Sequence, residues 1–400
     1  MNHQLLGALL KGERIRQKKS QKELCYGICV PSYLCKIENG SAKPDVEMWK
    51  KLFHKLDLSF EWEQPKVTLF QKKIEEYFHK IKFHCERDLL YKELNEWDKQ
   101  LRFSELVIDW LIIRMDQDEN EMELLEELVP VMTMKHRAFF TIIKLSKEKL
   151  SDSEMTQYIQ MCELLDESFA MNLLCLKHLH RGEYASIHRM EGKIVAKALS
   201  EGNLYQLADY YITNGSAYAC INQLEMMMDY YNRAIGLLEH TEWKGNLIGV
   251  YYNMGASYIS VGEYEKGIDY LEIAKEQYKM EDFMLQHKLA LAHVRLHNYE
   301  MARIYLAKME DQLANSTYLR RADHLKYKEV CMEMEDGFQM KPEYLALMEE
   351  LIDAVERDYH VGHLVFYKDL AMETFCIHRK YKKALVLDRK ISSIVLENVH

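Results

Sequence analysis

The stretch SQKELCYGICVPSYLCKIENG, residues 20–40, contains the start and stop signals of two short helices separated by a tight link. Ser20 and Glu23 stand at capping-box spacing, in which the serine oxygen accepts a backbone N–H of the first turn and the glutamate accepts the N–H of the cap residue. The spacing predicts a helix that begins at Gln21, runs through Leu24 and stops near Gly27.

The second half of this stretch predicts another helix. Pro31 has the fixed φ suited to a first helical turn, and Asn39-Gly40 is a left-handed C-terminal stop. Leu34 and Ile37 are predicted to point into a core. Three residues fall on the opposite face of this helix, where small polar and cationic groups can meet base edges and phosphates in a major groove: Ser32, Tyr33 and Lys36. The two helices together read as a helix-turn-helix that binds DNA.

Charge supports a nucleic-acid partner for this end of the chain. The whole chain has a net charge of -10, but residues 1–60 hold eleven Lys and Arg against six Asp and Glu. Gln21, at a helix N-terminus, is predicted to contact backbone phosphate, with a possible base contact. Three further cations are expected to attract the DNA phosphates without recognising the base sequence: Lys22, Lys43 and Arg16. The alternative is a helix-turn-helix that has lost its reading role and serves dimerisation or protein binding.

Further short helices complete a small N-terminal domain, predicted over residues 1–62. An opening helix over 3–18 is expected to place Leu6, Leu9, Leu10 and Ile15 on one apolar face. A fourth helix begins at Lys43-Pro44-Asp45, and its apolar face carries Met48, Trp49, Leu52 and Leu56.

These residues resemble a known family. The run from Gly12 through Pro44, with SQKEL, the link ICVPS, YLCKIENG and a following P-D, resembles the Xre-type (lambda-repressor-like) helix-turn-helix. The short link is most similar to that of the peptide-pheromone regulators of the PlcR and NprR type, in the RRNPP group. The small domain that carries this motif, residues 1–62, covers about a sixth of the chain, and the motif is specific compared with other short motifs. The resemblance implies a Gram-positive setting, a homodimer, and control by a secreted and re-imported signalling peptide.

Past the segment EWEQP, residues 61–65, the sequence changes to long helical patterns, which we assign to one array over 66–400. Only five prolines and sixteen glycines occur in 400 residues, so an all-α fold is predicted. A tetratricopeptide pattern is visible at Tyr251, Met254, Gly255 and Tyr258, followed by Gly267, Leu271 and Ala274. An earlier copy has Tyr211, Asn214, Gly215 and Tyr218, followed by Tyr231 and Ala234. The glycines are 40 residues apart, which indicates an insertion within 239–245.

Turn signals between paired helices recur at Gly182-Glu183-Tyr184, Gly262-Glu263-Tyr264, His297-Asn298-Tyr299 and Arg379-Lys380-Tyr381. Four segments lack the tetratricopeptide signature, and we assign them to the array only because they continue its helical pattern: 68–100, 103–133, 136–166 and 318–357. Stacked pairs of this kind form a right-handed superhelix whose first helices line a concave groove.

The groove is the predicted ligand site. Asn253 lies two residues before Gly255 on the first-helix face, and its amide can both donate to and accept from a peptide backbone. The resemblance strengthens this choice, because PlcR- and NprR-type regulators hold peptides through asparagines on inner helices. Other residues map to or near inner positions, and the cations among them could meet a peptide carboxylate: Asn214, Asn172, Tyr252, His287, Lys288 and Lys328. The alternative for each is a solvated surface residue.

Other functions find little support. His178 and His180 diverge on a helix, and Cys25, Cys29 and Cys35 lie where a small domain packs apolar groups, so neither set predicts a metal site. No Gly-rich phosphate loop, nucleophile elbow or framed carboxylate pair suggests a cofactor or an enzyme. The nine scattered cysteines favour a reducing, cytoplasmic setting, and no segment is predicted to span a membrane.

The sequence therefore predicts a DNA-binding transcription regulator whose operator binding is controlled by a short peptide. An alternative of another class is a helical scaffold that binds and sequesters a protein, for example a phosphorelay component.

Overall fold

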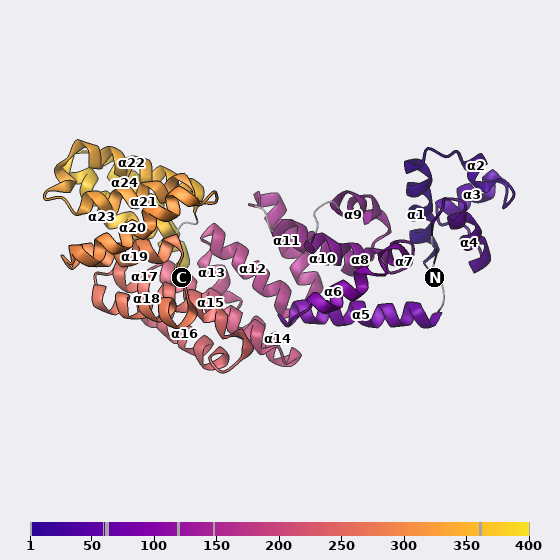
Figure 1. Ribbon diagram of the computed structural model, residues 1–400, viewed down its shortest axis with the longest axis horizontal. Coiled ribbons are helices and arrows are strands. Elements are labelled where there is room, and N and C mark those ends of the chain that lie inside the picture. The colour runs from indigo at the N-terminus through magenta and orange to yellow at the C-terminus, as the bar shows by residue number, and fades with distance from the viewer. Residues whose placement is uncertain are drawn as a thin grey trace. The chain divides into compact units, whose positions relative to one another are not determined.

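The structure is a computed structural model that describes residues 2–58, 60, 64–117, 121–146, 149–359 and 362–399. Throughout these ranges the regular elements are helices and no strand occurs, so the predicted all-α fold class is confirmed (Figure 1). By compactness the chain divides into residues 1–170 and residues 171–400. The predicted functional division at residues 62–66 is a different one and stays a prediction; residues 61–63 lie outside the described ranges.

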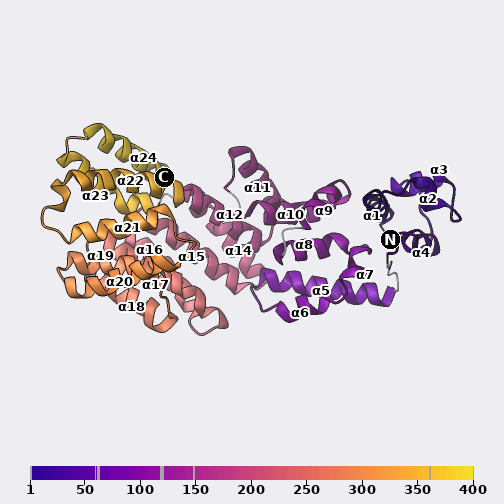
Figure 2. The same cartoon turned by 45° about the horizontal axis from the view of Figure 1, so that its top comes forward.

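The first unit consists of short and medium helices. They are α1 (His3–Arg16), α2 (Gln21–Cys25), α3 (Pro31–Glu38), α4 (Val46–His54), α5 (Gln64–Lys82), α6 (Asp88–Asn95), α7 (Asp98–Arg102), α8 (Val107–Gln117), α9 (Met122–Leu128), the 3-10 turn η2 (Val129–Val131), α10 (Met134–Ser146) and α11 (Asp152–Leu165). Figure 2 shows α1 to α4 gathered into one small bundle.

The core of this bundle continues into the helices that follow it. Leu10, Leu34 and Trp49 are fully buried in one cluster that also contains Leu111 of α8 and Phe140 of α10. The helix-turn-helix bundle therefore shares its apolar core with α8 to α10. Helices α8 to α10 therefore pack directly against the core of the helix-turn-helix.

One predicted core residue is wrong. Leu6, Leu9 and Leu10 are buried, but the side chain of Ile15 is 55% exposed. Ile15 lies six positions after Leu9, which is about 120° around a helix of 3.6 residues per turn, so it leaves the apolar stripe, whereas Leu5, four positions before Leu9, lies only about 40° from it. Leu5, which the prediction omitted, takes the place on that stripe.

The second unit begins within α12 (Ser168–Arg181). Its further elements are α13 (Tyr184–Arg189), α14 (Glu191–Glu201), α15 (Leu204–Cys220), α16 (Leu224–Leu238), η3 (Glu242–Asn246), α17 (Leu247–Ser260), α18 (Tyr264–Tyr278), α19 (Phe283–Arg295), α20 (Tyr299–Asn315), α21 (Arg321–Glu333), η4 (Phe338–Met340), α22 (Pro342–Asp358), α23 (Gly362–Ile377) and α24 (Tyr381–Val399). Successive helices from α15 to α24 pack as antiparallel pairs (Figure 1). The predicted insertion near 239–245 is the short 3-10 helix η3.

All four predicted turns between paired helices are present. Their first residues, Gly182, Gly262, His297 and Arg379, each have a positive φ, between 56° and 86°. This left-handed residue ends one helix and reverses the chain for the next. The repeated motif was therefore read correctly as a helix-pair turn.

The two glycines that marked the repeat also have a packing reason. A Cβ on Gly255 would lie 2.6 Å from Cγ of Leu271 and 2.7 Å from the carbonyl oxygen of Gly267. A Cβ on Gly215 would meet the Tyr231 ring at 2.6 Å. Each glycine thus allows the two helices of its pair to approach closely.

Candidate nucleic-acid interface and ligand cavity

The first helix of the helix-turn-helix is fixed by its cap. The Ser20 hydroxyl oxygen accepts the backbone N–H of Glu23 at 3.2 Å, and the Glu23 carboxylate accepts the backbone N–H of Ser20 at 2.6 Å. The helix ends at Cys25, and Gly27 follows with a φ of 75°. The predicted capping box is therefore present and sets the start of α2.

The second helix, α3, presents its polar face to solvent. Pro31 occupies the first turn, and Leu34 and Ile37 are fully buried. Ser32 and Lys36 are exposed, whereas Tyr33 is half-buried and packs against the core. Of the three residues predicted to meet base edges, Ser32 and Lys36 are therefore exposed, and Tyr33 is partly covered by the core.

A buried ion pair holds α1 against the end of α3. Arg14 donates to both carboxylate oxygens of Glu38, at 2.6 and 3.0 Å, and to the carbonyl oxygen of Lys19 at 2.9 Å. The hydrogen bonds with Glu38 raise the pKa of Arg14. Gln21 joins the same group, since its Nε2 donates to Glu38 at 2.7 Å. Its side-chain nitrogen is therefore engaged within the domain, and the predicted phosphate contact must use other atoms of Gln21.

Sequence reasoning missed this pair, although a signal was available. Arg14 follows Leu10 by four residues and therefore lies on the apolar stripe of α1. A cation in that position requires a buried partner. Around α3, Lys22 and Lys43 are exposed, while Arg16 is paired with Glu13 on its own helix.

The second unit contains a cavity of about 210 Å³ at the face where first helices of several pairs meet. It is lined by Leu179 of α12, by Ser216, Ala219 and Cys220 of α15, by Asn222 of the following turn, by Tyr252, Asn253, Ala256, Ser257 and Ser260 of α17, by Lys288 of α19, and by Gly362, His363, Val365 and Phe366 of α23. Among the described residues that line it, none comes from the second helix of a pair. The location is the one expected for the inner surface of such an array.

Three of the predicted ligand residues meet in this cavity. Nδ2 of Asn253 donates to the hydroxyl of Tyr231 at 3.1 Å and lies 3.3 Å from Oγ of Ser216. Tyr252 is half-buried, and burial raises its pKa. Lys288 is only 4% exposed, and its Nζ lies over the Phe366 ring. Burial, followed by the charge of Lys326, lowers the pKa of Lys288 well below its usual value.

The other four predicted ligand residues lie elsewhere. Asn172 is buried and donates to the carbonyl and side-chain oxygens of Gln206. Asn214 is fully buried, with its Oδ1 2.6 Å from Nδ1 of His188. The structure places both asparagines in hydrogen bonds between stacked helices, because their faces are covered by neighbouring pairs.

His287 and Lys328 are also outside the cavity. His287 is fully buried, its Nε2 lies 3.2 Å from the hydroxyl of Tyr367, and burial lowers its pKa well below the usual value. Lys328 is exposed and lines a separate depression near Leu347. Conversely, the predictions missed Phe366, because α23 is distant in sequence from α17 and no local pattern signals their proximity.

Two searches of the described residues bear on other site types. No group of three or more His, Cys, Asp or Glu side chains among them is arranged to hold a metal ion. In the same ranges, no helix combines the length and apolar character needed to cross a bilayer.

The fold and the exposed face of α3 define a DNA-binding protein of the helix-turn-helix class, followed by an array of paired helices. Residues 10–62 match the family described as Helix-turn-helix. The match covers the N-terminal part of the chain and supports the DNA-binding helix-turn-helix predicted there.

No curated protein shows significant sequence similarity to this chain. Among solved structures, PlcR of Bacillus thuringiensis in complex with the peptide PapR7 and DNA aligns at 14% identity and a TM-score of 0.26, covering 78% of this chain and 100% of that one. That likeness is too slight to carry over the fold or the ligands of the complex.

Proposed function

We propose that this chain is a cytoplasmic, homodimeric transcription regulator whose operator binding is controlled by a short signalling peptide, as in quorum sensing. The observation that carries the proposal is the cavity formed by first helices, where an amide, a phenol and an amino group converge from Asn253, Tyr252 and Lys288. An amide that donates and accepts suits a peptide backbone, and a lysine suits a carboxylate. The resemblance to RRNPP regulators is the second support. As part of this proposal, the helix pairs of the array are tetratricopeptide repeats.

Recognition begins with the exchange of hydrogen bonds at Asn253. In the free protein its nitrogen is held by Tyr231 and Ser216. A peptide carbonyl would take over this donor, while Lys288 receives a carboxylate. A nearby carboxylate favours the charged form of a lysine, so binding through Lys288 should be accompanied by proton uptake and should strengthen as pH falls.

The size of the cavity sets a condition on this mechanism. About 210 Å³ is less than the roughly 300–1,000 Å³ of typical small-molecule sites, so it accommodates one end of a peptide or one or two of its side chains. Helix α23 packs against α15 at this place and contributes Val365 and Phe366 to the wall. We propose that a whole peptide enters only when α23 withdraws from α15.

Such a movement of α23 would couple peptide binding to operator binding. In a dimer, two reading domains must match half-sites about one helical turn, roughly 34–36 Å, or a multiple apart. A rearrangement in the array that changes the distance between the two domains would permit or prevent operator binding.

The test uses the full-length protein and a DNA duplex selected from a randomised pool. A library of synthetic heptapeptides is titrated while operator binding is followed by fluorescence anisotropy and dimer state by light scattering. A change in either quantity with particular heptapeptides supports peptide control. If no peptide changes either quantity, the peptide-control proposal fails and capture of a protein partner becomes the better explanation of the array.

A further inference from the structure

The residue that caps the N-terminus of α3 differs in kind from the caps of its neighbours. Val30 is this N-cap, with β-region backbone angles and no side-chain hydrogen bond to the first turn. The other helices of the bundle have N-caps whose side chains accept a first-turn N–H: Asn2, Ser20 and Asp45. Asn, Asp and Ser are strongly preferred over valine at this position because they satisfy that N–H. The stability of α3 therefore does not explain Val30.

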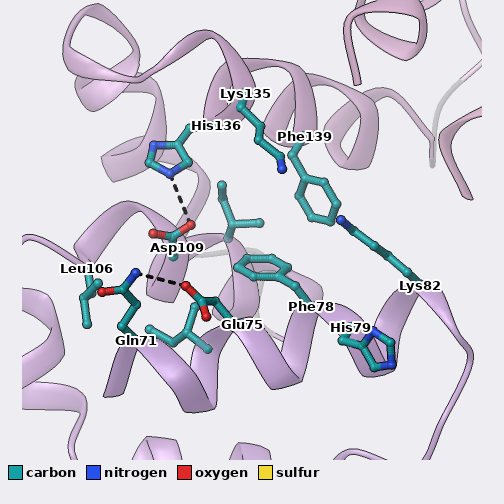
Figure 3. A pocket seen from close by; sticks show the side chains of 12 residues that line it. Gln71, Glu75, Phe78, His79, Lys82, Leu106, Asp109, Lys135, His136 and Phe139 are labelled. Carbon is teal, nitrogen blue, oxygen red and sulfur yellow. Dashed lines mark hydrogen bonds and ion pairs between the residues drawn. The ribbon is translucent and has the colours of Figure 1, made fainter. Parts of the chain in front are cut away.

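Packing inside the first unit does not explain Val30 either. Its side chain is 62% exposed and lies outside the core cluster, against which the neighbouring Ile28 and Cys29 pack. Val30 also does not line the cavity of about 420 Å³ between α5, α8 and α10. The wall of that cavity includes Phe78 and Phe139, whose rings meet edge to face with centroids 5.2 Å apart (Figure 3). Val30 is thus an apolar side chain that the free protein leaves in water.

Val30 stands next to the residues of α3 that are open to DNA. Ser32 follows two positions later, and both Ser32 and Lys36 are exposed. In a helix-turn-helix the N-terminal residues of the second helix contact base edges in the major groove. The link between α2 and α3 also exposes Tyr26, but Lys55 donates to the Tyr26 carbonyl and lies 5.3 Å from the centroid of its ring. Val30 is therefore the apolar group at the reading end of α3.

We propose that Val30 recognises the 5-methyl group of a thymine in each operator half-site. Base edges in the major groove present hydrogen-bond donors, acceptors and one apolar group, the thymine methyl. A donor or acceptor covered by valine would lose its water without gaining a partner, which is unfavourable. Contact with the methyl group instead buries two apolar surfaces. This inference depends on the DNA-binding role of α3 and is independent of the peptide proposal.

Binding of the selected operator to the full-length protein tests this contact. Each thymine of a half-site is replaced in turn by deoxyuridine, which removes only the methyl group, and affinity is measured by fluorescence anisotropy. For the wild type, one replacement should weaken binding about threefold to fivefold, the effect of burying one methyl group. Val30→Ala should bind thymine and deoxyuridine at that position equally well. Leu69→Ala, which removes a similarly exposed apolar side chain of α5, should keep the preference of the wild type.

The variant Val30→Ser separates recognition from stability. Serine is a preferred N-cap, so this change should raise the thermal midpoint of the first unit by about 2–4 °C. The same change should abolish the discrimination between thymine and deoxyuridine, because the hydroxyl group replaces the apolar surface. A purely structural role of Val30 predicts the opposite pair of results, with lower stability and an unchanged preference for thymine.

The inference is overturned if no deoxyuridine replacement weakens binding by the wild type. It is also overturned if the loss persists in both Val30→Ala and Val30→Ser, as it would if the thymine acted through DNA shape. If the randomised pool yields no operator, DNA binding by the chain fails and this inference fails with it. The dimer state recorded in the heptapeptide titration is independent of Val30, so the failure of one proposal is distinguishable from the failure of the other.

Discussion

The guanidinium of Arg14 clamps the carboxylate of Glu38, with Nε–Oε1 at 2.6 Å and Nη2–Oε2 at 3.0 Å. The two side chains are only 11% and 1% exposed. This contact joins the first helix of the chain to the end of the proposed recognition helix, and Gln21 adds the first helix of the helix-turn-helix to the same carboxylate. One acidic residue therefore links all three helices through hydrogen bonds.

Replacement of Glu38 by alanine should cost about 3–5 kcal/mol of stability in the N-terminal bundle, because it leaves Arg14 buried without its partner. Hydrogen exchange of the α1–α4 amides measures the loss. Glu47→Ala, which removes an exposed partner of Lys50 on α4, should change stability by less than about 1 kcal/mol. Equal protection in the two variants would contradict the role given to Glu38.

Replacement of Lys36 by alanine should weaken binding to the selected operator by about 1–3 kcal/mol if Lys36 reads a base edge, while the fold stays intact. A phosphate contact would instead lower affinity on all sequences and reduce the salt slope by about one. Tyr33→Ala should weaken binding and also lower stability, since Tyr33 packs on the core. Unchanged footprints for Lys36→Ala, with Lys50→Ala as the reference, would remove α3 as the reading helix.

Replacement of Gly255 by alanine should destabilise the second unit by about 1–3 kcal/mol, because the new methyl group meets Leu271 and the backbone of Gly267. Gly249→Ala in the same helix is the matched control, since its Cβ meets nothing within 4 Å. That change should be neutral or stabilising by up to about 1 kcal/mol through helix propensity. Thermal unfolding separates the two, and a Gly255→Ala variant as stable as Gly249→Ala would show that α17 and α18 can move apart at little cost.

Replacement of Asn253 by alanine should reduce the affinity for a responsive heptapeptide by about 1–2 kcal/mol, the effect of removing one buried hydrogen-bond partner. Asn315→Ala, at the exposed end of α20, should leave that affinity as it is. Asn253 also bonds Tyr231, so thermal unfolding of both variants is recorded to separate binding from stability. An unaltered titration would exclude Asn253 from the peptide site.

The free energy of unfolding should depend on pH through Lys326, and the direction follows from the pKa of this side chain. Burial lowers its pKa to about 8, and Asp323 opposes this shift in part, whereas the unfolded chain has a pKa of about 10.4. The folded protein holds the proton less tightly, so the stability contributed by this group is present above about pH 10.4 and is lost as pH falls through about 8. Measured against Lys326→Met, the free energy of unfolding of the wild type should rise by on the order of 3 kcal/mol between about pH 7 and pH 10.4. Parallel pH profiles for the two proteins would contradict this.

Local signals in the sequence were sufficient for several features. The Ser20–Glu23 capping box, the Pro31 start and the turns between paired helices at Gly262 and His297 were all found as predicted. Each of these depends on the chemistry of residues within one or two turns of a helix. Such signals act over a few residues, so they can be read from a single chain.

Side-chain roles that depend on distant partners could not be read in this way. Asn253 and Asn214 occupy similar places near the repeat glycines, yet Asn253 borders a cavity while Asn214 is fully buried against His188. The difference arises from which helix covers each face. In the case of the cavity that helix is α23, more than a hundred residues further along the chain.

The sequence by itself therefore determined the all-helical class, the helix-turn-helix and the pairing of helices, because these follow from composition, periodicity and caps. The tertiary structure decided which polar groups are exposed to a ligand and which are consumed by internal bonds, as Gln21 is by Glu38. The physical reason is that hydrogen bonds and burial are settled between surfaces far apart in the chain, and no local pattern records which surfaces will meet.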